Sequence, residues 1–192
     1  MKVRLFVAVA LVTSSFSPAP AAAQLGSGGS DAGRLTLGVS LSGSQIASDA
    51  VANPTAPRGG LGLTVGYGIS ERVSAFVRGI SGYQSTQVDL GVRYRFGGAS
   101  QRLRPYVEGA VTAIGATGRT PFEERGEGLS RPTRSTGTGF TAGAGLEYFI
   151  SPRLGVDLGV THSLGRFGHP VETQFDRTFS ATRLHVGLTW RP

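Results

Sequence analysis

Residues 138–164 carry the sequence TGFTAGAGLEYFI-SPR-LGVDLGVTHSL, in which apolar side chains alternate with small or polar ones. In the first arm, Phe140 and Tyr148 fall on one face, and the other face carries glycine, threonine and Glu147. A period of two fits a β-strand, whose successive side chains point to opposite faces, and does not fit one face of a helix. Pro152 lies between the arms, where its missing N–H costs no ladder bond. We therefore predict a β-hairpin with one apolar face and one glycine-rich, charged face.

The same alternation recurs through the chain from Arg34 onward. The expected strands comprise residues 34–42, 60–69, 73–80, 86–96, 103–114, 138–150, 154–164 and 181–190. Each has about ten residues, the length that a tilted strand needs to cross a bilayer. Long loops are expected at 43–59, 115–137 and 165–180, and short turns join the other strands. Short turns alternating with long loops are typical of outer-membrane barrels, and only the short connection 81–85 departs from this pattern.

The alternation alone leaves open which face points inward, because a soluble eight-stranded barrel of the lipocalin type alternates equally well. Two features favour a membrane barrel. Isolated charges at mid-strand among glycines suit a narrow lumen that is filled by side chains. Aromatic residues gather at strand ends beside the short turns, as in an interfacial girdle: Tyr67, Phe96, Tyr148, Phe149 and Trp190. The sequence therefore predicts an all-β fold, an eight-stranded antiparallel up-and-down transmembrane β-barrel.

The composition agrees with this class. The chain has 192 residues, 30 glycines and no cysteine. The lack of cysteine excludes disulfides, cysteine-based zinc sites and a lipid-attached cysteine. The formal net charge is +7, and Lys2 is the only lysine. A water-exposed surface usually mixes lysine with glutamate, so the near-absence of lysine counts against such a surface. A GC-rich genome would produce the same excess of arginine over lysine.

The N-terminus has the pattern of a secretory signal. Lys2 and Arg4 precede the apolar run LFVAVALV at 5–12, and the small residues at 21–23 offer a cleavage site. The apolar run is too short to span a bilayer. We predict a cleaved signal peptide over residues 1–23, a flexible lead-in over 24–33 and the barrel domain over 34–192.

Two stretches carry a family resemblance, RPYVEG at 104–109 and GAGLEY at 143–148. With the eight-strand pattern, they make the chain similar to the small outer-membrane β-barrels of the OmpA/OmpX type, also labelled porin-family proteins. The resemblance covers about 34–190 and implies a location in the outer membrane, with lipid and lipopolysaccharide as neighbours. Barrels of this family usually end on an aromatic residue, whereas here Arg191 and Pro192 follow Trp190.

The face opposite the apolar one is expected to hold a network of charges. A register centred on the turn after the fourth strand places Arg93 opposite Glu108. If this face is the lumen, the two charges are held away from bulk water and should pair. The predicted lumen network comprises Arg78, Asp89, Arg93, Arg95, Glu108, Glu147, Asp157, Arg183 and His185.

Candidate chemistry is sparse. The pair His162–Ser163, with Glu147 or Glu172 to orient it, resembles the Ser/His/Glu triad of lipid A deacylases. Adjacent strand residues point to opposite faces, however, so this pair does not suit a nucleophile and its base. We place His162 at the barrel rim and His169 in a loop, and we expect no catalytic residue, no metal site and no cofactor.

The loop at 119–134 mixes glutamates with four arginines, Arg119, Arg125, Arg131 and Arg134. Arginine binds phosphate in a bidentate way, so this loop is a candidate surface for lipopolysaccharide phosphates or an extracellular partner. A solvated loop without a partner would have the same composition. Nucleic-acid binding is not expected, because the arginines do not cluster with aromatic residues that could stack on bases.

Taken together, these patterns predict a non-enzymatic outer-membrane barrel with an envelope-structural or surface-interaction role. An eight-stranded barrel is just wide enough for its own side chains, which argues against general diffusion. The alternative is a small porin-like barrel that transports a small or hydrophobic solute.

Overall fold

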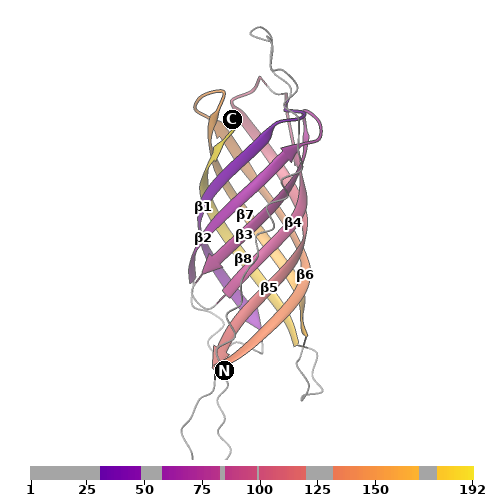
Figure 1. Cartoon of the computed structure of the whole chain (residues 1–192), viewed down its shortest axis with the longest axis vertical. Helices are drawn as coiled ribbons and strands as arrows, with labels where there is room; N and C mark the ends of the chain where they lie inside the picture. The colour runs from indigo at the N-terminus through magenta and orange to yellow at the C-terminus, as the bar shows by residue number, and fades with distance from the viewer. Residues whose placement is uncertain (1–30, 49–57, 83–84, 99, 120–131, 169–176) are drawn as a thin grey trace, which may run out of the picture.

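The computed structural model describes residues 31–48, 58–82, 85–98, 100–119, 132–168 and 177–192 (Figure 1). They form the strands β1 (Leu35–Ser48), β2 (Arg58–Gly68), β3 (Val73–Gly82), β4 (Ser85–Arg95), β5 (Leu103–Arg119), β6 (Pro132–Phe149), β7 (Leu154–Gly168) and β8 (Arg177–Trp190). Within these ranges, no helix is long and apolar enough to cross a membrane.

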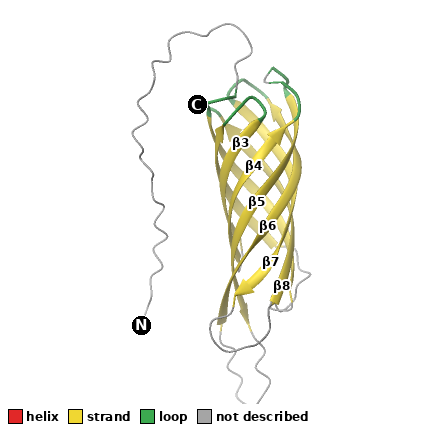
Figure 2. Cartoon of the chain, turned by 90° about the vertical axis from the view of Figure 1, so that its right-hand side faces the viewer, coloured by secondary structure: helices red, strands yellow, loops and turns green. Residues whose placement is uncertain are grey.

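Each strand pairs antiparallel with the next, and β1 pairs with β8, so the sheet closes into a barrel. Figures 1 and 2 show the strands tilted against the barrel axis. Partners traced from Leu90 through β3, β2 and β1 reach Trp190. Partners traced through β5, β6 and β7 reach Ser180, ten residues earlier in β8. This offset is the shear that accompanies strand tilt in a closed barrel. The predicted eight-stranded antiparallel barrel is therefore confirmed.

One end of the barrel carries the short turns at 69–72, 96–102 and 150–153, and we call it the turn end. We call the opposite end the loop end. There the strands extend beyond their predicted bounds, with β1 continuing to Ser48, β5 to Arg119 and β7 to Gly168, and with β6 and β8 starting at Pro132 and Arg177. The predicted loops were therefore too long. Apolar residues alternate along a strand only where lipid lies against one face of the sheet. The backbone hydrogen bonds between strands do not need lipid, so the strands continue beyond the alternating segments.

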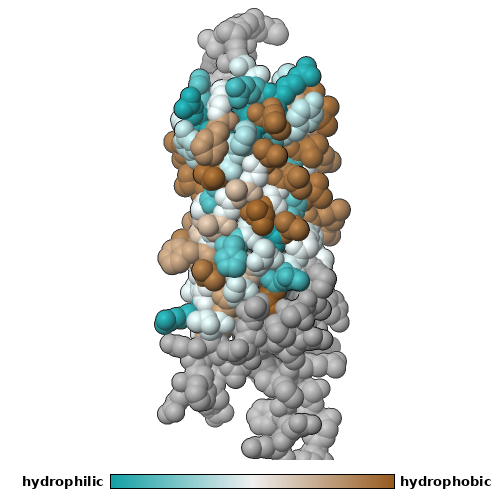
Figure 3. All heavy atoms as spheres, turned by 180° about the vertical axis from the view of Figure 1, so that it is seen from behind, coloured by the Kyte–Doolittle hydropathy of each residue, from teal (hydrophilic) through white to brown (hydrophobic). Residues whose placement is uncertain are grey.

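The apolar face of every strand points outward. Leu63 is 66% exposed and Phe140 is 73% exposed, while Arg93 and Glu108 on the opposite face are 6% and 7% exposed. Hydrophobic residues cover much of the described exterior in Figure 3. A soluble barrel would bury this face, because soluble monomers rarely expose apolar patches larger than a few hundred Å². The arrangement is that of a transmembrane barrel, whose apolar band meets lipid.

Four of the five predicted girdle aromatics lie on the outer face at the turn end. These half-exposed residues are Tyr67, Phe96, Tyr148 and Trp190. The prediction for Phe149 was wrong, since its side chain points into the barrel and is 6% exposed. Phe149 directly follows Tyr148 in β6, so the two side chains must face opposite sides of the sheet.

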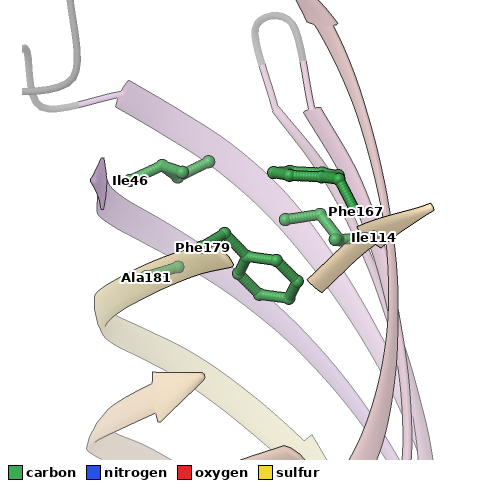
Figure 4. Packing of buried hydrophobic residues seen from close by; sticks show 5 residues of the cluster. All are labelled: Ile46, Ile114, Phe167, Phe179 and Ala181. Atoms are coloured by element: carbon green, nitrogen blue, oxygen red, sulfur yellow. The ribbon is translucent and has the colours of Figure 1, made fainter. Parts of the chain in front are cut away.

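An apolar cluster fills the barrel near the loop end, and the sequence did not predict it. Its side chains converge in Figure 4 from β1, β5, β7 and β8, and they are Ile46, Ile114, Phe167, Phe179 and Ala181. The ring centroids of Phe167 and Phe179 lie 5.0 Å apart. Most of these residues come from strand ends that the sequence assigned to loops.

Candidate functional site in the barrel lumen

All nine residues of the predicted lumen network are buried inside the barrel. The strand register brings several of them directly opposite one another. Arg93 pairs with Glu108 across β4 and β5, as the sequence predicted. Glu147 pairs with Asp157 across β6 and β7. The closed barrel then brings the two pairs close to each other.

Arg93 lies at the centre of the network and contacts three carboxylates. Its Nε and Nη2 donate to Glu108 at 3.1 and 2.9 Å. Its Nη1 donates to Glu147 at 2.6 Å and to Asp157 at 3.2 Å. The guanidinium also stacks on Tyr106, with its carbon 3.8 Å from the ring centroid. One arginine thus joins β4, β5, β6 and β7 through charge-assisted hydrogen bonds, which are about twice as strong as neutral ones.

Two further arginines extend this centre. Arg78 donates to Glu108 at 2.5 Å. Arg95 donates to Glu147 at 2.7 Å and to the hydroxyl of Ser74 at 2.9 Å. Glu108 contacts two arginines and Glu147 contacts Arg93, Arg95 and also Arg191, so each carboxylate balances charge from more than one side. A buried charge is tolerated only when it is paired and hydrogen-bonded in this way.

Tyr106 ties the network to His185 and was not among the predicted residues. Its hydroxyl donates to Asp157 at 2.7 Å and lies 3.3 Å from Nε2 of His185. The same Nε2 lies 3.8 Å from Asp157. A Cβ at Gly159 would lie 2.5 Å from the Tyr106 hydroxyl, so a side chain there would displace the ring. The position of Tyr106 on the inward face of the fifth strand could have identified it from the sequence.

Asp89 and Arg183 form a separate group closer to the loop end. Gln87 bridges them, because it donates to Asp89 at 2.6 Å and accepts from Arg183 at 2.5 Å. Thr112 also donates to Asp89, at 2.8 Å. Among the described residues, Arg183 Nε and Nη1 have no hydrogen-bond partner. Asp89 and Arg183 are therefore linked through the uncharged side chain of Gln87, and they lie outside the group of ion pairs around Arg93.

Little space remains between these side chains. The cavity beside Arg78, Arg95 and His185 has a volume of about 30 Å³. This volume holds about one or two water molecules. Around this network, the lumen is therefore filled by protein side chains.

The histidine and serine of the candidate dyad face opposite sides, as predicted. His162 lies on the outer face, where Nδ1 is 2.9 Å from Thr182 Oγ1 and Nε2 is 3.5 Å from Ser180 Oγ. Ser163 faces the lumen and contacts Thr141 at 2.7 Å. Glu147, the candidate orienting carboxylate, is held by Arg93 and Arg95. The second candidate, Glu172, and also His169 lie outside the described residues.

The four predicted loop arginines are described only in part. Arg119 ends β5 and Arg134 lies in β6, where the register pairs Arg134 with Thr117. Arg125 and Arg131 lie outside the described residues. Across the described ranges, no three histidine or carboxylate side chains are grouped so that they could hold a metal ion.

The sequence missed a second set of buried charges at the turn end. Asp31 is buried and contacts Arg104 and Arg191. The predicted flexible lead-in therefore does not extend to Asp31. The partners are far apart in the chain, so no local pattern could have indicated the contact.

Residues 8–191 match the family model of the outer membrane protein beta-barrel domain. The chain belongs to this family and is an outer-membrane protein. No curated protein sequence matches it.

Solved structures with the same fold include three small barrels. Neisserial surface protein A (NspA) is 14% identical with a TM-score of 0.61, covering 85% of this chain and 97% of that chain. OprG from Pseudomonas aeruginosa is 14% identical with a TM-score of 0.54, and the match covers 86% of this chain and 98% of the OprG chain. Ail of Yersinia pestis, in complex with the heparin analogue sucrose octasulfate, is 13% identical with a TM-score of 0.50. The match covers 83% of this chain and 99% of the Ail chain.

Proposed function

We propose that this protein is a non-enzymatic, non-conducting barrel that presents its long loops on the cell surface. The observation that carries this proposal is the filled lumen. Ion pairs around Arg93 link four strands, and the apolar cluster of Figure 4 fills the barrel nearer the loop end. A solute would have to displace charges that are paired and buried, and breaking such a pair typically costs ~3–5 kcal/mol.

The first test is single-channel conductance of the refolded protein in planar bilayers. We expect no steady openings at any applied potential, because the side chains leave space for little more than water. A large porin reconstituted in the same bilayers serves as the positive control. Reproducible openings would favour the alternative function, transport of a small solute.

The outer face offers little for catalysis. His162 contacts the hydroxyls of Thr182 and Ser180, and no described carboxylate contacts it. A nucleophilic hydroxyl requires a base that a third group orients. The side chains of His162, Thr182 and Ser180 therefore satisfy one another's hydrogen-bonding groups on the lipid-facing side of the barrel. This arrangement supports a non-enzymatic barrel.

The surface that we assign to the function is the loop end, with Arg119, Arg125, Arg131 and Arg134. Long loops of outer-membrane barrels face outward and short turns face the periplasm. Guanidinium groups bind phosphate and sulfate in a bidentate way, so we assign them a polyanionic partner such as lipopolysaccharide phosphates. The complex of Ail with sucrose octasulfate is a precedent in a barrel of the same fold.

Retention on immobilised heparin tests the loop assignment. Replacing Arg125 and Arg131 by Gln should lower the salt concentration that elutes the refolded protein, because each phosphate or sulfate contact adds to the salt dependence. The matched control replaces Arg72 and Arg153 in the turns, which removes the same charge from the turn end. Equal shifts for the two double variants would mean that retention follows net charge, and the loop assignment would be wrong.

A further inference from the structure

The turn end of the lumen contains two arginines that converge on one carboxylate. Arg191 Nη1 donates to Asp31 Oδ1 at 2.7 Å, and Arg104 Nη1 donates to Asp31 Oδ2. Arg104 belongs to β5, Arg191 follows β8, and Asp31 precedes β1. All three side chains are buried. Each carboxylate oxygen thus has its own guanidinium donor.

Both arginines are also held by groups other than Asp31. The guanidinium carbons of Arg191 and Arg104 lie 3.9 and 4.8 Å from the ring centroid of Phe149. Arg104 Nε donates to the carbonyl of Gln101 at 3.0 Å, and Arg191 Nη2 lies 3.7 Å from Glu147. Cation–π contacts of this kind attract the guanidinium to the ring face independently of Asp31. The two donors should therefore keep their positions when the Asp31 carboxylate is absent.

The backbone of residues 31–34 packs against the barrel wall, and this places Asp31 beside the two arginines. Gly33 has a φ of +75°, a conformation that glycine adopts without steric cost. Its N–H donates to the carbonyl of Gly68 at 2.8 Å, and the N–H of Gly68 donates to the carbonyl of Arg34 at 2.9 Å. A Cβ at Gly68 would lie 1.8 Å from the carbonyl oxygen of Asp31, so only glycine fits there.

The surroundings favour an anion. A pocket of about 300 Å³ borders this site, and its charged lining residues are Asp31, Arg34, Arg102, Arg104 and Arg191. Four of these five are cations. Burial lowers the pKa of Arg191 to about 10, with Asp31 acting in the opposite direction, so the guanidinium is still charged at neutral pH. Buried guanidinium groups without a counter-charge are costly, so the site requires a carboxylate or a similar anion.

We propose that Arg104, Arg191 and the ring of Phe149 form a carboxylate-binding site, and that Asp31 occupies it as an intramolecular ligand. A free carboxylate can replace Asp31 and release residues 31–34 from the mouth of the barrel. The site also gives Arg191, which directly follows β8, a structural role.

Chemical rescue tests the site on the full chain refolded in detergent. Asp31→Ala should lower the urea midpoint of unfolding, and acetate should recover at least half of the loss, while chloride at the same ionic strength should not. Calorimetric titration should detect one bound acetate in Asp31→Ala and none after the further change Arg191→Gln. Glu71→Ala, which removes an exposed carboxylate from a turn, is the matched control and should show no response to acetate.

Equal effects of acetate and chloride on Asp31→Ala, or rescue of the double variant, would overturn the proposal. A measurement on the unmodified chain covers the case in which Asp31→Ala does not refold. Acetate should accelerate hydrogen exchange of the Gly33 and Gly68 amides, because their hydrogen bonds hold 31–34 in place. Exchange that responds to acetate no more than to chloride would equally overturn it.

Discussion

Arg93 and Glu108 are direct register partners on β4 and β5, and two nitrogens of the arginine lie 3.1 and 2.9 Å from one oxygen of the carboxylate. The other oxygen of Glu108 accepts from Arg78 at 2.5 Å. Glu108 therefore balances two arginines, and Arg93 in turn binds Glu147 and Asp157. This pair connects one antiparallel hairpin to the rest of the lumen.

The glycine-rich inner face gives the first prediction. A Cβ at Gly159 would lie 2.5 Å from the Tyr106 hydroxyl and 2.6 Å from Cε1 of His185. Gly159→Ala should therefore destabilise the barrel by about 1–3 kcal/mol, the usual cost of overpacking a tight interior. Gly109→Ala is the control, because a Cβ there has nothing within 4 Å. Urea unfolding of both variants in the same detergent measures the difference, and equal stabilities would mean that Tyr106 is not packed as described.

Much of this inner face could be predicted from the sequence. A period of two assigns each residue to the lipid or the lumen, and turn lengths then fix the register that brings Arg93 opposite Glu108. The exposed Leu63 and the buried Glu147 both follow from that rule. The inward position of Phe149 follows from the same rule, because the neighbouring Tyr148 faces outward.

Other features depend on contacts that alternation does not encode. Ile46, Phe167 and Phe179 lie beyond the predicted strand ends, where no lipid imposes a contrast between the two faces. Asp31 and Arg191 are separated by 160 positions in the chain, and their contact exists only because the barrel closes. Gln87 carries no charge, so its role as a bridge between Arg183 and Asp89 could not be read from charge patterns.

The apolar cluster at the loop end gives a second prediction. Phe179 is buried against Phe167, whereas Phe140 faces lipid. Phe179→Ala should cost about 3–5 kcal/mol of unfolding free energy, because it leaves a cavity inside the barrel. Phe140→Ala removes the same atoms from the outer face and should cost much less, because detergent or lipid fills the space. Losses of similar size in urea unfolding would show that the cluster is not a packed core.

Orientation gives a third prediction. If the loop end faces outward, trypsin added to whole cells should cleave after Arg125 and should spare Arg72 and Arg153 in the turns. Mass spectrometry of the released fragments identifies the cuts, and permeabilised cells provide the control in which the turns become accessible. Cleavage at Arg72 or Arg153 in intact cells would invert the proposed topology.

Paired charges fill and hold the lumen around Arg93, and a double-mutant cycle on Arg93 and Glu108 tests this most directly. Glu108→Ala should destabilise the refolded barrel by about 3–5 kcal/mol, because Arg78 and Arg93 are left without their shared carboxylate. Adding Arg93→Ala should recover part of this loss, since one uncompensated charge is removed. Urea unfolding of the four proteins should give a coupling energy well above about 0.5 kcal/mol. A coupling energy below that value would mean that these charges do not depend on each other inside the barrel, and that paired charges do not hold the lumen.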